Sequence, residues 1–174
     1  MRIFLLVILA SVLSLSAAEP PSWPKAVREL TDSSFVPTKA SKLPQGISLF
    51  HREESAEQRA NREVGLLWVD LDGDGVLDLI VRNDEGGSGG TFYTIYQMQK
   101  GGYRSIGVFQ GFRPKLLTAS NGYLQIEAWS RGGGLESSRD LYRFERGEYR
   151  CVREDNYRTD EEKGKIYVGT NNPQ

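Results

Sequence analysis

From position 64 onward, the sequence consists of short apolar or alternating runs that are divided by glycine. Such runs are typical of antiparallel strands joined by turns. In the segment 123–129, Leu124, Ile126 and Ala128 alternate with polar residues, so we expect a half-buried strand there. The pattern predicts a mainly β protein that forms a compact antiparallel sheet or meander. A two-layer β structure is the alternative arrangement of the same strands. The expected strands lie near 64–70, 77–82, 91–99, 103–109, 115–119, 123–130, 139–145 and 148–153.

The segments around these strands are expected to be less regular. Five prolines lie between 19 and 45, which is too many for long elements, so we expect a proline-rich lead-in there. A short N-terminal helix at 25–30 would place Val27 and Leu30 against the body. The polar run 52–63 is rich in helix-forming residues and suits a short solvated helix. We thus expect one β-rich domain over 46–158 and a polar C-terminal tail over 159–174, with one candidate strand at 166–168.

The first 18 residues have the composition of a secretory signal peptide. Arg2 precedes the apolar run 3–15, and the small residues Ser16, Ala17 and Ala18 follow. Because the run is shorter than the roughly 20 residues that cross a bilayer, we expect cleavage after Ala18 rather than an uncleaved membrane anchor. The mature protein is expected to be secreted or periplasmic, with no membrane span after cleavage. Cys151 is the only cysteine, so no intramolecular disulfide forms.

The charge of the chain limits its partners. The 22 lysines and arginines nearly balance the 23 acidic residues, and no basic stripe is present. This excludes the electrostatic footprint of a nucleic-acid or anionic-membrane binder. We therefore expect an unidentified protein or glycan partner and no nucleic acid.

The segment 70–78 has the spacing of a loop that wraps a hard cation. Asp70, Asp72, Asp74 and Asp78 stand at positions 1, 3, 5 and 9 of the loop, and Val76 offers a carbonyl at position 7. Two carboxylates about 5 Å apart repel by roughly 3 kcal/mol at an effective dielectric near 20, so such a cluster favours a counter-cation. Oxygen ligands in a flexible loop favour calcium (Ca²⁺) over magnesium. The alternative is an acidic surface turn whose carboxylates only cap the backbone.

The loop differs from the helical calcium hand. Val81 stands at position 12, where that motif has a bidentate glutamate, and apolar strand-like runs flank the loop. The segment WVDLDGDGVLDLIV resembles the calcium loops of the FG-GAP and VCBS repeat families. The resemblance implies a strand–loop–strand hairpin of the kind found in β-propeller blades. It implies as ligands the carbonyl of Val76 and the side chains of Asp70, Asp72, Asp74 and Asp78. Because the chain contains one such loop and no repeat, a sheet that is only partly propeller-like is expected.

In a meander, successive connections alternate between the two ends of the sheet. The acidic loop then shares an end with the turns at 101, 121 and 146, and the glycine-rich connections 85–90, 111–115 and 131–138 lie at the opposite end. This arrangement suggests that calcium is a structural staple and that the other end is the candidate recognition surface. Plain flexible linkage is the alternative. The four cations expected to gather there, where they would accept an anionic ligand, are Arg113, Lys115, Arg131 and Arg139.

Nothing in the sequence indicates an active site. His51 is the sole histidine, and no zinc-ligand cluster or nucleophile elbow is present. We therefore expect an exported, calcium-binding, noncatalytic interaction or structural module. The alternative is an enzyme, or an enzyme inhibitor, that acts on an envelope polymer such as a glycan. An open groove lined by Trp129, Tyr142 and Phe144 would favour the alternative, and burial of these rings would favour the module.

Overall fold

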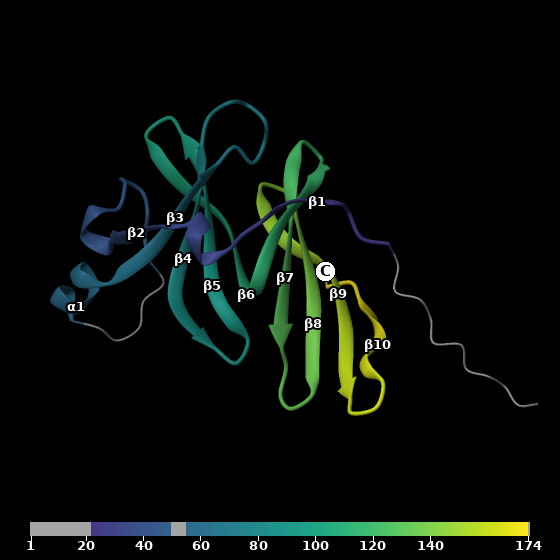
Figure 1. The fold of residues 1–174 in the computed structure, drawn as a ribbon. Helices are drawn as coiled ribbons and strands as arrows, with labels where there is room; N and C mark the ends of the chain where they lie inside the picture. Colours follow the sequence, from purple (N-terminus) through teal and green to yellow (C-terminus); the bar gives the residue numbers. More distant parts are fainter. Residues whose placement is uncertain (1–21, 50–54, 174) are drawn as a thin grey trace, which may run out of the picture.

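The computed structural model describes residues 22–49 and 55–173 (Figure 1). The expected signal peptide over 1–18 and His51 lie outside the described residues. The helical elements within the described residues are the short 3-10 helices η1 (Asp32–Ser34) and η2 (Ala40–Lys42) and the α-helix α1 (Ala56–Asn61). The strands are β1 (Ala26–Glu29), β2 (Val36–Lys39), β3 (Glu63–Val69), β4 (Asp78–Gly87), β5 (Gly90–Gln99), β6 (Gly102–Ser120), β7 (Tyr123–Arg131), β8 (Glu136–Glu145), β9 (Glu148–Asp160) and β10 (Gly164–Asn171).

The strands form one antiparallel sheet in the order of the sequence. Each strand from β2 to β10 pairs with the next one along the chain, and β1 pairs separately with β6. The connections at 121–122 and 146–147 are two-residue turns in which Asn121 and Arg146 have φ of 55° and a glycine follows. The prediction of a mainly β, antiparallel meander is confirmed.

The strand β6 belongs to both halves of the sheet. It pairs with β5 over Gly102–Gly111 and with β7 over Phe112–Ser120, and it bends between these two stretches (Figure 1). The strands expected at 103–109 and 115–119 are therefore the two arms of one strand. Gly111 is required at the bend, because a Cβ there would lie 2.7 Å from the carbonyl oxygen of Trp129.

The bend brings apolar side chains of both halves into one core. Tyr93 of β5 stacks on Phe109 of β6, with ring centroids 4.6 Å apart, and Phe109 contacts Tyr142 of β8 at 5.7 Å. At Gly107 a Cβ would lie 2.7 Å from the Cβ of Tyr149, so β6 and β9 approach closely. The fully buried members of this core include Ile80, Ile95, Leu116, Ile126 and Ala128.

A second core lies on the other face of the first half. Residues of β3, β4 and β5, such as Leu66, Leu79 and Tyr96, pack there under Leu43 of the lead-in and Ile47, which follows it. The hydroxyl of Tyr96 donates a hydrogen bond to the carbonyl oxygen of Ser48. The lead-in thus covers an apolar face that would otherwise be exposed.

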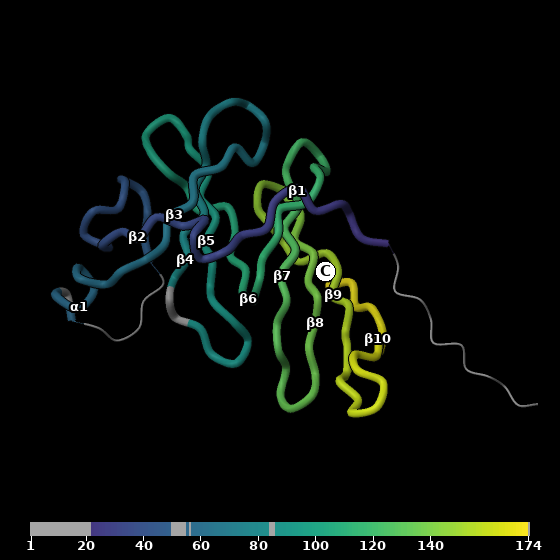
Figure 2. The backbone as a smooth tube through the Cα atoms, viewed as in Figure 1, coloured from purple at the N-terminus to yellow at the C-terminus, as the bar shows by residue number. Residues whose placement is uncertain are grey.

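Two expectations for the ends of the chain differ from the structure. The helix expected at 25–30 is wrong, since Ala26–Glu29 is the strand β1. The amide of Thr118 donates to the carbonyl of Lys25, and that of Leu30 to the carbonyl of Pro114, both at 2.9 Å. The segment is therefore extended because its backbone pairs with the edge of β6 that would otherwise be unpaired. Beyond 159, β10 pairs with β9 and extends well past the candidate strand at 166–168 (Figure 2). The helix expected within 52–63 is present as α1, which is capped by Ser55.

Candidate metal centre

The acidic loop joins β3 directly to β4. The two strands pair up to Val69 and Asp78, so the intervening residues form a strand–loop–strand hairpin. Gly73 and Gly75 have φ of 76° and 83°, a backbone conformation that side chains other than asparagine and aspartate rarely adopt. The two glycines allow the tight reversal that turns the acidic side chains toward one another.

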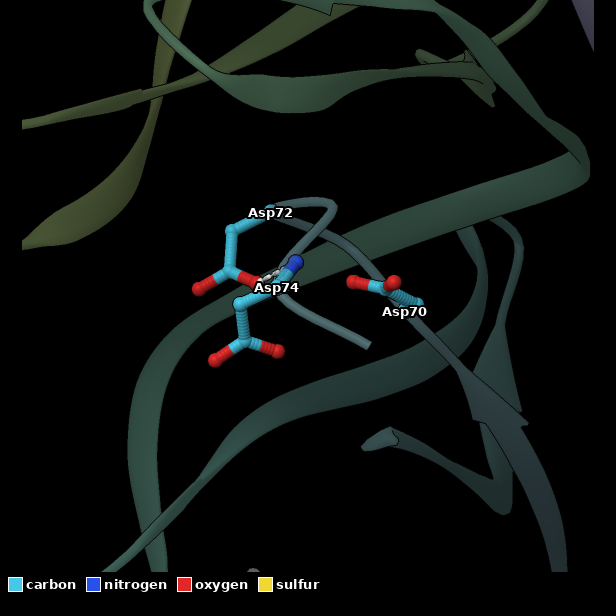
Figure 3. A group of neighbouring side chains, drawn as sticks. All are labelled: Asp70, Asp72 and Asp74. Carbon is cyan, nitrogen blue, oxygen red and sulfur yellow. Dashed lines mark hydrogen bonds between the residues drawn. The ribbon is translucent and has the colours of Figure 1, made fainter. Parts of the chain in front are cut away.

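Three carboxylates meet in this loop. One oxygen each of Asp70, Asp72 and Asp74 lies within 4.8 Å of the others (Figure 3). Calcium binds oxygen at about 2.3–2.6 Å, so two of its ligand atoms can lie up to about 5 Å apart. The three oxygens therefore fit around one such ion. The set contains no nitrogen or sulfur ligand, which suits a hard cation.

Backbone amides of the loop fix the orientation of these carboxylates. Asp70 accepts hydrogen bonds from the amides of Gly73 at 2.7 Å and Gly75 at 3.0 Å. Asp74 accepts one from the amide of Val76 at 2.7 Å, and Asp72 one from the amide of Asp74 at 3.2 Å. Carboxylate oxygens have further lone pairs, so these bonds leave room for metal ligation. Bonds of this kind also cap the backbone of acidic surface turns.

Asp78, the fourth predicted aspartate, is not part of this group of converging carboxylates. It is buried, and its two oxygens accept hydrogen bonds from the amides of Leu71 at 3.3 Å and Met98 at 3.1 Å. Burial, together with the nearby charges of Asp72 and Asp74, raises its pKa to about 6 despite these bonds. Val76, the remaining predicted ligand, is exposed in the loop.

Residues of the strands β5 and β7 form hydrogen bonds with the acidic loop. Gln97 of β5 donates from Nε2 to Asp72 at 3.0 Å, and the same nitrogen lies 2.8 Å from the hydroxyl of Tyr123 of β7. The amide of Leu124 donates to the carbonyl of Leu71 at 2.8 Å. Sequence reasoning missed Gln97 and Tyr123, because their proximity depends on the register of β5 and on the bend of β6. No local motif indicates either of them.

The two ends of the sheet differ as the meander implies. The connections β3–β4, β5–β6 and β6–β7 lie at one end, and β4–β5, β7–β8 and β9–β10 lie at the other (Figure 1). The acidic loop is therefore far from the glycine-rich β7–β8 connection.

The three rings Trp129, Tyr142 and Phe144 do not line one common groove: of the three, only Trp129 lines a cavity, which lies beside the bend in β6. Phe144 stacks on Tyr123 with a centroid distance of 3.7 Å, and both pack on the main core with Tyr142. Trp129 has Tyr157 at 5.2 Å, and the amine of Lys165 lies 3.8 Å from its ring centroid. These rings are already in contact with other side chains of the protein.

Cys151 of β9 lacks the properties of a nucleophile. Burial, followed by the charge of nearby Asp140, raises its pKa to about 11. Because this pKa lies well above neutral pH, the residue stays a thiol there, and the reactive form is the thiolate.

None of the helices in the described residues is long and apolar enough to cross a bilayer.

Comparison with known proteins adds no relative. No family model matches the chain, and no curated protein or solved structure shows significant similarity to it.

Proposed function

We propose that this protein is an exported, calcium-binding, noncatalytic interaction or structural module in which calcium fastens the β3–β4 hairpin to the sheet. The observation that carries the proposal is the convergence of Asp70, Asp72 and Asp74, whose carboxylate oxygens lie within 4.8 Å of one another. Like charges at this separation repel, and a divalent cation removes that repulsion.

The proposed ligand set follows the loop spacing and the resemblance to the FG-GAP and VCBS calcium loops. It comprises the side chains of Asp70, Asp72 and Asp74, the carbonyl of Val76, and the side chain of Asp78. The loop amides bonded to Asp70 and Asp74 support this set, since they hold the carboxylates in place before an ion arrives. When bound, the ion supplies positive charge, which favours the ionised form of every carboxyl group around it.

A structural role for the ion is supported by what the loop touches. Asp72 is tied to β5 through Gln97, and Leu71 is tied to β7 through the amide of Leu124. An ion that orders the loop therefore stabilises contacts to both halves of the sheet. A ligand present at 100 times its Kd stabilises the folded state by about 2.7 kcal/mol. The chain forms no disulfide, so a bound ion can supply the stability that disulfides give to many exported proteins.

The noncatalytic part of the proposal is supported by Cys151 and by the aromatic rings. The raised pKa of Cys151 opposes its use as a nucleophile, and Trp129, Tyr142 and Phe144 are packed against other side chains. The alternative, an enzyme or inhibitor acting on a glycan, would have only Trp129 of these three rings on a cavity wall, where the amine of Lys165 already lies 3.8 Å from the ring centroid.

Calorimetric titration of the mature chain 19–174 with calcium, after chelator treatment, tests the proposal. We expect one ion per chain and weaker binding of magnesium. Asp72→Asn and Asp74→Asn should each lower the affinity at least about tenfold, or 1.4 kcal/mol. The matched control is Asp160→Asn, because Asp160 also accepts amide hydrogen bonds in a turn but belongs to no carboxylate cluster among the described residues. Calcium binding that is absent, or that is the same in all three variants, overturns the proposal.

A further inference from the structure

A large basic cavity lies on the side of the bend in β6. Its volume is about 1120 Å³, and it is bounded by β1 and η1, by the bend, by the β7–β8 connection and by β10. Four basic residues line it: Arg113, Lys115, Arg131 and Lys165. The sequence predicted the first three as neighbours. Lys165 joins them through the register of β10, whereas Arg139 lies apart, in an ion pair with Glu127 at 2.8 Å.

Three of these cations have no carboxylate partner in the part of the chain that the structure describes. Lys115 is paired with Glu29 at 3.2 Å, and Asp32, which also lines the cavity, is paired with Arg82 at 2.7 Å. Among the described residues, no carboxylate forms an ion pair with Arg113, Arg131 or Lys165. The remaining acidic residue of the lining is Glu136, so a net positive charge is left in the cavity.

The three cations also repel one another. Burial lowers the pKa of Lys165, and the charges of Arg131 and Arg113 lower it further. An anion placed among them would reverse this effect, because an opposite charge favours the protonated amine.

The backbone at Arg113 is strained. Its φ is 49°, and it stands inside β6 directly before Pro114. The other described non-glycine residues with positive φ, Asn121 and Arg146, are in two-residue hairpin turns, where this conformation is ordinary. Glycine would satisfy the backbone at position 113 better than arginine does. Strain kept at a charged residue that lines a cavity is a feature of binding sites.

Apolar surface accompanies the charge. Phe112 and Leu135 are exposed and line the cavity, and the guanidinium of Arg131 lies 5.5 Å from the ring centroid of Phe112. A ligand with an apolar body can therefore contact these side chains while its charged groups meet the three cations.

We propose that this cavity binds a small organic anion, whose carboxylate or phosphate groups are held by Arg113, Arg131 and Lys165 and whose apolar portion rests on Phe112 and Leu135. Arginine suits such a site because its planar fork of donors matches carboxylate and phosphate oxygens. The site is separate from the acidic loop and does not depend on calcium.

Titration at low ionic strength with two probes tests the proposal. Benzene-1,3,5-tricarboxylate presents carboxylates on an apolar ring, and inorganic pyrophosphate presents phosphate alone. Calorimetry gives the affinity, and NMR of the ε-methylene group of Lys165 reports the site. We expect binding by at least one probe and a rise in the pKa of Lys165. Binding of the tricarboxylate alone assigns carboxylate chemistry, and binding of pyrophosphate alone assigns phosphate. The neutral triamide of the same ring should not bind.

Single variants separate binding from folding. Arg131→Gln and Lys165→Gln should each weaken binding at least about tenfold. Arg113→Gly should weaken it similarly while leaving the melting temperature unchanged or higher, since glycine relieves the strain. Arg104→Gln is the matched control, because Arg104 is exposed on the first arm of β6 and does not line the cavity. The proposal fails if neither probe binds below about 10 mM, if the triamide binds as well, or if the three variants bind like the control.

Discussion

The indole nitrogen Nε1 of Trp23 donates a hydrogen bond of 2.7 Å to Oδ2 of Asp155, although 132 positions separate the two residues. Asp155 is fully buried, and it also accepts hydrogen bonds from Arg153 and Thr170. Arg153 in turn donates to the carbonyl of Ser22 at 3.2 Å. One carboxylate thus fastens the start of the described chain to β9 and β10.

Asp155→Asn should destabilise the protein by roughly 3 kcal/mol at pH 7, because it leaves the Arg153 guanidinium without its charged partner. Burial alone would raise the pKa of Asp155, but the hydrogen bonds from Arg153, Thr170 and Trp23 outweigh burial and lower it. A lowered folded-state pKa contributes stability above the unfolded pKa, and this stability is lost as the pH falls through the folded pKa. Urea unfolding across the acid range measures both effects.

The exposed turn residue Glu161 provides the control for Asp155. Glu161→Gln should behave like wild type at every pH. Equal stability of Asp155→Asn and Glu161→Gln would show that the buried carboxylate adds nothing.

Calcium should raise the melting temperature of the mature protein, and a chelator should reverse the rise, because the proposed site exists in the folded loop and not in the unfolded chain. Trp68 stands two residues before Asp70 and is partly exposed, so its fluorescence should change in the same titration. Asp74→Asn should shift both responses to at least about tenfold higher calcium concentrations, and Asp160→Asn should keep the wild-type responses. Identical melting of wild type with calcium and with chelator would argue against a structural ion.

Asp140→Asn should stabilise the protein above pH 6 and lose this advantage toward pH 4. Burial raises the pKa of Asp140 to about 6, and its Oδ1 has no hydrogen-bond partner among the described residues. Because the folded state binds the proton more tightly than the unfolded state, wild type loses stability as the pH rises from about 4 to about 6. The asparagine amide is always neutral and avoids this loss, which we put at roughly 2 kcal/mol.

Thermal unfolding of Asp140→Asn and wild type at pH 4, 5, 6, 7 and 8, values spanning the two ionisation ranges, tests this prediction. A stability difference that does not change with pH would mean that Asp140 stays ionised in the folded protein.

Gly107→Ala should destabilise the protein by roughly 1–3 kcal/mol, since the added methyl group would lie 2.7 Å from the Cβ of Tyr149 and force β6 and β9 apart. The matched control is Gly133→Ala in the β7–β8 connection, where an added Cβ meets no atom within 4 Å. Urea midpoints of the two variants give the comparison. An equal effect at both positions would contradict close packing of the two halves.

The features predictable from the sequence are those encoded within one segment. The hairpin around Asp70 follows from ligand spacing and apolar flanks within a single run of residues. The turn at Asn121 follows from an asparagine–glycine pair. Local patterns of this kind need no knowledge of the rest of the chain.

Features that depend on register were not predictable. Alternation in β7 suggested one buried face, yet Gln125 and Glu127 are also buried, because Arg143 and Arg139 of β8 cover them with hydrogen bonds. The position of Lys165 depends on the pairing of β10 with β9, which no short motif specifies. Ala26–Glu29, within the expected helix at 25–30, forms the strand β1 because an edge of β6 is available for pairing.

The bend in β6 couples the unfolding of the two halves of the sheet. The two arms of this strand share one continuous backbone, and side chains from both halves fill the same core. Peeling either half away would expose the apolar face of the other, so neither half is expected to persist alone. The protein should therefore lose its structure in a single cooperative transition.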